Sequence, residues 1–163
     1  MFTIGNHTKQ RPIATQRSGE SALDPDGLLE PKLNECFLYH GTKSEVAELV
    51  ATHGFDERVG SLDGLFGSGV YFANQSCKSA QYTTDENGLR TILICRVALG
   101  DPHYAQGALQ QARRPPERTT APVSKGLTFD SVVANTGGRQ VHREFIVYDH
   151  RQAYPEYIVK FKP

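Results

Sequence analysis

Short apolar runs, rather than long amphipathic ones, set the pattern of this chain, and most of them have the length of β-strands. The runs that we expect to be strands are residues 36–40, 70–73, 91–99, 144–148 and 157–161. They outnumber the helical segments and do not alternate with them regularly. The pattern therefore predicts an α+β fold of mostly antiparallel strands with few short helices.

The clearest helical segment follows the first of these strands. Thr42 and Glu45 are spaced as a capping box, in which the Thr42 hydroxyl can reach the Glu45 amide. Val46, Leu49 and Val50 then form an apolar stripe at helical spacing. We expect an amphipathic helix here, ending before a glycine.

The segments between these elements have less regular patterns. Residues 56–68 are rich in glycine and predict a flexible loop, and residues 76–82 predict a short helix. Residues 103–128 contain prolines and little periodicity, so the pattern predicts no element there.

The length of 163 residues suits a single domain. Residues 1–33 carry prolines, glycines and scattered charge without a period, which predicts a flexible N-terminal segment or linker ahead of one folded domain over residues 34–163. The N-terminus lacks the apolar stretch of a secretory signal, and no apolar run is long enough to span a membrane. We therefore expect no membrane partner and action in a cytoplasm.

Charge and cysteine content argue against two kinds of site. Lys plus Arg and Asp plus Glu both number 18, so nucleic-acid binding through bulk charge is not expected. The cysteines Cys36, Cys77 and Cys95 cannot all pair, and neither a CxxC motif nor zinc-finger spacing to a histidine occurs. We expect free thiols buried in the core and no metal site.

Three polar positions near strand ends are candidates for chemistry, and each also has a plain structural interpretation. His40 ends an apolar strand, and the following Gly41 either makes a turn or lets a ligand lie against the backbone. Tyr71 is typical of core packing, and Glu144 is typical of an exposed strand edge. None of these positions decides the function by itself.

The order of several sequence blocks is more informative. They are HGT at 40–42, GFDERVGSLDGLFGSGVYFA at 54–73, SCKSAQY at 76–82, EFIVYD at 144–149 and QAYPEYIVKF at 152–161. Together they resemble the catalytic domain of poly(ADP-ribose) polymerases, in the His-Tyr-Glu group of diphtheria-toxin-like ADP-ribosyltransferases. The second and last blocks look most similar to tankyrases. The resemblance implies a PARP-like fold with a split sheet around a cleft for NAD⁺, the co-substrate, and makes residues 34–163 the catalytic domain.

The resemblance also implies which residues bind NAD⁺. The Gly41 backbone and the Ser79 hydroxyl would hold the nicotinamide carboxamide, and Tyr71 and Tyr82 would sandwich the ring. His40 would bond the adenine-side ribose. Thr42 would lie nearby at the same strand end.

By the same resemblance, Glu144 is the catalytic glutamate, with His40 and Tyr71 completing the signature. Loss of nicotinamide builds positive charge on the ribose carbon, and a carboxylate bonded to the 2′-hydroxyl stabilises it. Lys78 has two interpretations, either fixing this glutamate or lying exposed on a helix. The zinc-bearing insertion of tankyrases is absent, because only TTDENGLR separates Tyr82 from Thr91.

The intact signature favours ADP-ribosyl transfer to a macromolecular acceptor, a protein side chain or an RNA hydroxyl, over NAD⁺ hydrolysis or a silent binding module. A retained glutamate leaves chain elongation possible. Between Gly107 and Arg143 the chain is mainly basic, which is typical either of a site for a phosphate-rich acceptor or of a solvated loop. The basic residues are Arg113, Arg114, Arg118, Lys125, Arg139 and Arg143.

The setting of the domain suggests two origins. A bare transferase module behind a polar segment resembles the C-terminal toxin domains of bacterial polymorphic toxins. That resemblance implies an effector delivered by a secretion system into the cytoplasm of a target cell, with a cognate immunity protein as partner. The alternative is a eukaryotic-type signalling transferase that attaches one or many ADP-ribose units.

Overall fold

The computed structural model describes residues 27–118, 126–135 and 142–162. Its strands are β1 (Glu35–Gly41), β2 (Val70–Ala73), β3 (Arg90–Ala98), β4 (Pro102–Ala105), β5 (Ser131–Asn135), β6 (Arg143–Val147) and β7 (Ala153–Phe161). The α-helices are α1 (Ser44–His53) and α2 (Ser76–Ala80), and short 3-10 helices cover Pro31–Leu33, Glu57–Val59 and His150–Gln152. The predicted α+β class is confirmed.

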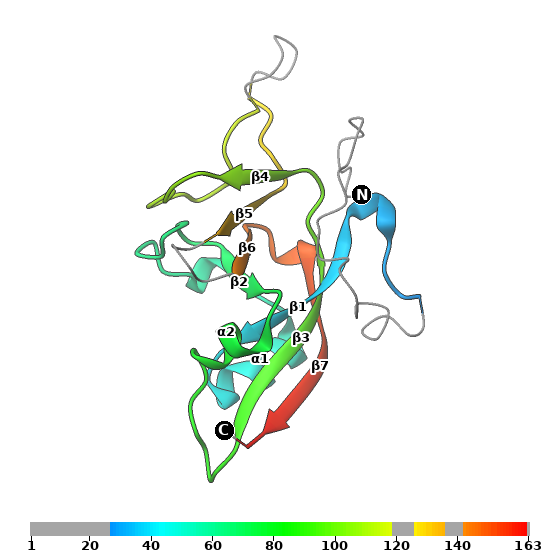
Figure 1. The fold of residues 1–163 in the computed structure, drawn as a ribbon, viewed down its shortest axis with the longest axis vertical. Helices are drawn as coiled ribbons and strands as arrows, with labels where there is room; N and C mark the ends of the chain where they lie inside the picture. The colour runs from blue at the N-terminus through cyan, green and yellow to red at the C-terminus, as the bar shows by residue number, and fades with distance from the viewer. Residues whose placement is uncertain (1–26, 119–125, 136–141, 163) are drawn as a thin grey trace.

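The strands form one sheet in the order β4-β5-β6-β2-β1-β3-β7, in which only β4 and β5 run parallel (Figure 1). β1 pairs with β3 along its whole length, but it meets β2 only at Tyr39–Ala73. The sheet therefore divides into a β4-β5-β6-β2 part and a β1-β3-β7 part that diverge beyond this pair. A split sheet is what the family resemblance implies, and the candidate site lies at this divergence.

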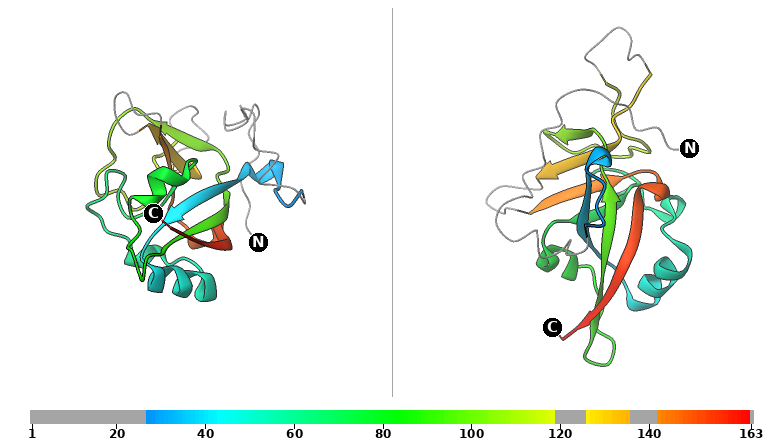
Figure 2. Two further views of the ribbon diagram at one scale, coloured as in Figure 1. Left: turned by 60° about the horizontal axis from the view of Figure 1, so that its bottom comes forward. Right: turned by 90° about the vertical axis from the view of Figure 1, so that its right-hand side faces the viewer.

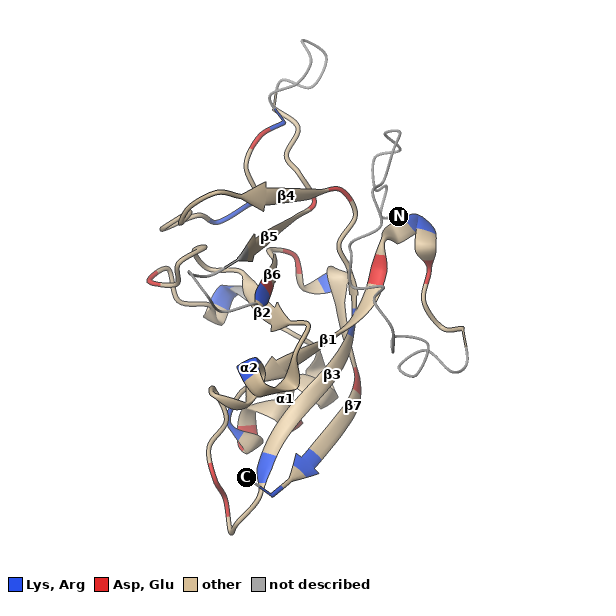
Figure 3. Cartoon of the chain, viewed as in Figure 1, with Lys and Arg blue, Asp and Glu red and all other residues tan. Residues whose placement is uncertain are grey.

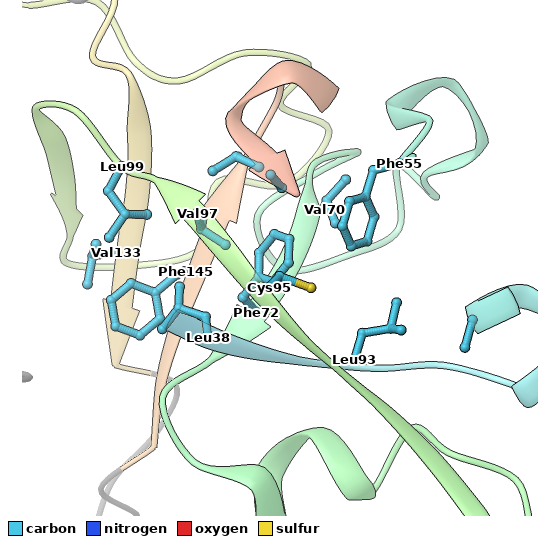
Figure 4. Close-up of a cluster of buried hydrophobic side chains, with 13 residues drawn as sticks. Leu38, Phe55, Val70, Phe72, Leu93, Cys95, Val97, Leu99, Val133 and Phe145 are labelled. Atoms are coloured by element: carbon cyan, nitrogen blue, oxygen red, sulfur yellow. The ribbon is translucent and has the colours of Figure 1, made fainter. Parts of the chain in front are cut away.

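Two apolar clusters hold the elements together. The larger one joins β1, β2, β3 and β6 and contains fully buried Leu38, Leu93 and Phe145 (Figure 4). The smaller one contains Phe66, Val132, Ala134 and Ile146. Since side chains alternate along a strand, Phe145 and Ile146 serve opposite faces of β6, and Glu144 shares the face of Ile146.

The two helices lie on opposite faces of the β1-β3-β7 part (Figure 2, right). The predicted capping box is wrong, because the N-cap is Lys43 and no side chain caps the helix. Instead, the Ser44 hydroxyl shares a 3.0 Å hydrogen bond with the hydroxyl of Thr91 on β3. The small residues Ser44 and Ala47 face the sheet, whereas Leu49 of the predicted stripe is 59% exposed.

Other predictions have mixed outcomes. β1, β2, β3 and β6 lie within about a residue of their expected bounds, whereas β7 begins at Ala153 and β4 and β5 were not expected. Cys95 is buried as predicted, but Cys77 is exposed. Residues 1–26 of the predicted N-terminal segment lie outside the described residues. Within the described part, no helix combines the length and apolar character needed to cross a membrane.

Candidate functional site

The candidate site begins where β1 and β2 separate. Tyr39 is the last residue of β1 that pairs with β2, so His40 and Gly41 extend into the gap. Tyr71 lies on β2, two residues before Ala73, which pairs with Glu144 of β6. Segments far apart in the sequence thus bring an imidazole, a phenol and a carboxylate to one place.

A cavity of about 530 Å³ opens at this divergence. Its volume lies in the range of small-molecule binding sites. The eight predicted site residues all line it, namely His40, Gly41, Thr42, Tyr71, Lys78, Ser79, Tyr82 and Glu144. The structure therefore brings together every residue that the sequence singled out for the site.

His40 bridges the two diverging strands. Its Nδ1 lies 2.8 Å from the Tyr71 carbonyl oxygen, and because a carbonyl only accepts, Nδ1 carries the hydrogen. Burial lowers the pKa of His40 below 6.5, and the bond to Tyr71 offsets this only in part. The imidazole is therefore neutral at neutral pH, with Nε2 as a hydrogen-bond acceptor. The rings of Phe55 and Phe72 pack against it at centroid distances of 5.2 and 5.5 Å.

Glu144 is a buried carboxylate in contact with a cation. It is 6% exposed, and its Oε1 lies 3.2 Å from Nζ of Lys78 on α2. Lys78 also donates to the Tyr82 hydroxyl at 3.2 Å. Burial opposes the charge on Lys78, but the bond to Tyr82 and the charge of Glu144 outweigh it and raise the pKa above 10.5. Of the two interpretations of Lys78, the structure gives the contact with Glu144.

Gly41 and Ser79 form a close backbone contact between β1 and α2. A Cβ atom at Gly41 would lie 1.8 Å from the Ser79 carbonyl oxygen, so no other residue fits without movement. The buried Ser79 hydroxyl donates to the Tyr39 carbonyl at 2.9 Å. This contact fixes α2, and with it Lys78, relative to the end of β1.

Tyr71 forms a wall of the cavity and contacts the loop after α1. Its hydroxyl accepts a hydrogen bond from the Phe66 amide and donates one to the Gly67 carbonyl, both at 2.9 Å. Burial and the charge of Glu144 raise the pKa of Tyr71 despite the bond from Phe66. Tyr82 lies more openly at the cavity mouth and is 57% exposed.

The cavity also has an apolar side that the sequence interpretation missed. Val46 and Val50 of α1, Phe55, and Val59 and Leu65 of the following loop line it. The helical stripe did contain a signal, since Val46 and Val50 line the cavity, while Val50 also packs against the larger apolar cluster. Phe55 lies within the GFDE block, where the resemblance alone gave it no role.

No group of three or more His, Cys, Asp or Glu side chains suited to a metal ion occurs in the parts of the chain that the structure describes.

Comparison with known proteins gives an independent view of the chain. A family model described as the poly(ADP-ribose) polymerase catalytic domain matches residues 2–163. The human protein mono-ADP-ribosyltransferase PARP11 is 31% identical over 152 residues, covering 80% of this chain and 42% of that protein. Mouse PARP12, also named a protein mono-ADP-ribosyltransferase, is 27% identical over 131 residues, covering 80% of this chain and 17% of that protein. The poly [ADP-ribose] polymerase 2 of Caenorhabditis elegans is 33% identical over 92 residues, covering 55% of this chain and 17% of that protein.

This chain thus spans less than half the length of the curated relatives that it matches. Those named here are animal enzymes, neither tankyrases nor bacterial toxins. The expected similarity to tankyrases and the expected toxin setting gain no support from them.

Proposed function

Because the chain belongs to the poly(ADP-ribose) polymerase catalytic-domain family, we propose that it cleaves NAD⁺ at the nicotinamide–ribose bond and transfers ADP-ribose to a macromolecular acceptor. The observation that carries this proposal is the meeting of His40, Tyr71 and Glu144 on one cavity, from β1, β2 and β6. The volume and chemistry of that cavity fit the nicotinamide half of NAD⁺, as each residue in turn indicates.

Tyr71 and Tyr82 flank the nicotinamide in this proposal. A pyridinium ring is cationic, and the electron-rich faces of two phenols attract a cation, at about 1 kcal/mol for each contact. The backbone groups of Gly41 and the hydroxyl of Ser79 orient the carboxamide. Their rigidity supports this role, since the close packing of Gly41 on Ser79 holds these polar groups in place before a ligand arrives.

His40 and Thr42 bind ribose hydroxyl groups. A neutral imidazole whose Nδ1–H is engaged by the Tyr71 carbonyl offers Nε2 as an acceptor for an O–H donor. The Thr42 hydroxyl lines the same cavity two residues along and can both donate and accept.

Glu144 performs the chemical step. Its carboxylate accepts a hydrogen bond from the ribose 2′-hydroxyl and stabilises the positive charge that grows on the ribose carbon as nicotinamide leaves. Lys78, held by Tyr82 on its other side, fixes the position of this carboxylate. Fixed charges of this kind need no reorganisation during the reaction, which is why they accelerate it.

We propose a protein side chain as the acceptor and a single transfer as the reaction. Two relatives are named protein mono-ADP-ribosyltransferases, which supports this choice, although Glu144 leaves elongation possible. The basic stretch at 107–143, which suggested an RNA acceptor, is partly neutralised by acidic partners. Arg114 pairs with Glu117, and Arg118 pairs with Asp101 and Asp130. In Figure 3, acidic and basic residues are interspersed along the described chain. Lys125 and Arg139 lie outside the described residues.

The named mono-ADP-ribosyltransferase relatives are human and mouse proteins, so they support a eukaryotic-type signalling role over the role of a bacterial toxin. We therefore propose no cognate immunity protein as a partner.

The test is incubation of the protein with adenine-labelled NAD⁺ and a cell extract, followed by separate protease and nuclease digestion. We expect label in macromolecules that protease removes and RNase leaves. The matched variant Glu144→Gln should lower the rate by about 10²–10³ while retaining NAD⁺ binding. Label released only as free ADP-ribose would identify a glycohydrolase. Equal rates in the two proteins would refute the assigned role of Glu144.

A further inference from the structure

The loop after α1 is held unevenly along its length. Arg58 and Val59, in its first half, are both largely exposed, and the Arg58 side chain bonds Asp56 two residues away. Phe66, in its second half, is buried in the smaller apolar cluster. The second half is therefore anchored to the body of the domain, whereas Arg58 and Val59 in the first half lie at the surface.

Hydrogen bonds reinforce the anchor on both sides of the Phe66–Gly67 turn. The Leu109 amide donates to the Leu65 carbonyl at 2.8 Å, and the Ser68 amide donates to the Ala112 carbonyl at 2.9 Å. Gly67 has a φ of +73°, and a Cβ there would lie 1.9 Å from the Ala112 carbonyl oxygen. The turn therefore requires glycine and is fitted closely against residues 109–112.

Two tyrosine hydroxyls complete the hydrogen bonding of this turn. Tyr148 donates to the Phe66 carbonyl at 2.6 Å, from just beyond the end of β6. Tyr71 accepts from the Phe66 amide and donates to the Gly67 carbonyl. Tyr148 and Tyr71 thus both form hydrogen bonds with the same dipeptide, so the Phe66–Gly67 turn links the two side chains.

We propose that Tyr148 is a positioning residue for the NAD⁺ site, which acts through the Phe66–Gly67 turn on the ring of Tyr71. The inference rests on the proposed function. Tyr148 does not line the cavity, so its effect on the site must pass through the turn that it contacts. It fixes the wall against which the nicotinamide stacks, and it lies on the same chain segment as Glu144, four residues further along.

A physical consequence separates this role from mere stability. Loss of the Tyr148 hydroxyl leaves the Phe66 carbonyl without its donor and loosens the turn. NAD⁺ must then order the wall when it binds, which weakens binding but leaves the carboxylate of Glu144 in place. A purely structural role would instead lower the amount of folded enzyme, and thus the apparent kcat, at unchanged KM.

The test compares Tyr148→Phe with Ser131→Ala. Ser131 is fully buried, and its hydroxyl donates to the Leu99 carbonyl at 2.7 Å, so the control removes the same kind of bond away from the cavity lining. We expect Tyr148→Phe to raise the Kd of NAD⁺ in calorimetry, and the KM, by about three- to tenfold with kcat within about twofold. Ser131→Ala should lower Tm without changing the Kd. An unchanged Kd in Tyr148→Phe, or an equal rise in both variants, would overturn the inference.

Amide hydrogen exchange tests the anchor in the wild-type protein, whether or not a variant folds. The amides of Phe66, Gly67 and Ser68 all have acceptors and should be protected before NAD⁺ is added. Exchange at residues 66–68 as fast as at residues 58–63 would refute the anchor. If the wild-type protein binds no NAD⁺, the proposed function fails and the inference fails with it. Normal binding that does not depend on Tyr148 would refute the inference alone.

Discussion

Gly41→Ala is the smallest change that should disrupt the whole site. The added Cβ would lie 1.8 Å from the carbonyl oxygen of Ser79 and 2.6 Å from its carbonyl carbon. Ordinary van der Waals contact begins near 3.4 Å, so the two backbones must separate by about 1.6 Å. Neither atom belongs to a flexible side chain, and the movement therefore displaces β1 or α2 as a unit.

The expected loss follows from what α2 carries. Lys78 and Ser79 both lie on this short helix, and the 3.2 Å contact between Lys78 and Glu144 depends on its position. Overpacking of this kind costs about 1–3 kcal/mol of folding stability. Misplacement of binding groups by about 1 Å costs about 10² in activity. We expect the unfolding free energy to fall by about 2 kcal/mol and kcat/KM to fall by about 10² or more.

The assay pairs urea denaturation with steady-state turnover of NAD⁺. Gly107→Ala is the matched control, since no atom lies within 4 Å of the position that its new methyl group would take and its φ is not positive. The control should retain wild-type stability and kcat/KM. If Gly41→Ala behaves like Gly107→Ala, then the Gly41–Ser79 contact does not organise the site, and the argument for a rigid carboxamide pocket fails.

Two further predictions concern the charged groups. Burial lowers the pKa of His40 below 6.5 in the folded protein. As the pH drops below 6.5, the unfolded chain therefore takes up a proton before the folded chain does. His40 thus makes the unfolding free energy fall as the pH drops from 6.5 and has no effect on it well above that pH. Urea titrations at about pH 7.5 and about pH 5.5 should show a smaller loss in His40→Gln, and equal losses would contradict this sign. Arg118→Met should lower the unfolding free energy by about 2–4 kcal/mol, because Arg118 is 11% exposed and pairs with Asp101 and Asp130. Arg114→Met removes a pair whose arginine is 69% exposed and should cost less than about 0.5 kcal/mol, so similar losses in urea denaturation would refute the distinction.

The site was more predictable from the sequence than parts of the sheet. His40, Tyr71 and Glu144 each stand within or beside a short apolar strand, and such strands have a strong local signal. Their meeting was not derivable from local pattern, because it depends on how β1, β2 and β6 pair. The ordered sequence blocks supplied that information through the family resemblance.

β4 and β5 were missed for reasons of length and position. β4 spans Pro102–Ala105, begins with proline and lies at the edge of the sheet, where little burial constrains its pattern. β5 is buried, but its apolar run of Val132, Val133 and Ala134 is too short to show a period. β4 and β5 pair in parallel, and parallel strands are usually joined by a helix. Among the described residues no helix lies between them, so the sequence held no helical signal that would have predicted this pairing.

The α1 stripe shows a different limit. A helical period shows that one face differs from the others, but it does not say what that face contacts. Small Ser44 and Ala47 allow the helix to approach β3 closely, and Val46 and Val50 then turn toward the cavity. The period thus predicted an apolar stripe correctly, but it did not show that two of its residues would line the cavity.

The charges around the cavity suit a reaction in which positive charge moves. In the proposed reaction it starts on the nicotinamide ring and passes to the ribose carbon as the bond breaks, so nicotinamide leaves neutral. Neutral aromatic faces then lose most of their electrostatic attraction for the leaving group, while a carboxylate beside the ribose gains attraction for the carbon. His40, which binds the adenine-side ribose in this proposal, stays neutral and so adds no second positive charge to the cavity. Among the described ion pairs, Lys78 is the one cation in contact with the Glu144 carboxylate. Lys78 also donates a hydrogen bond to the Tyr82 hydroxyl, so its charge is shared between two partners. Lys78 can therefore orient Glu144 with less loss of the negative charge that the transition state needs.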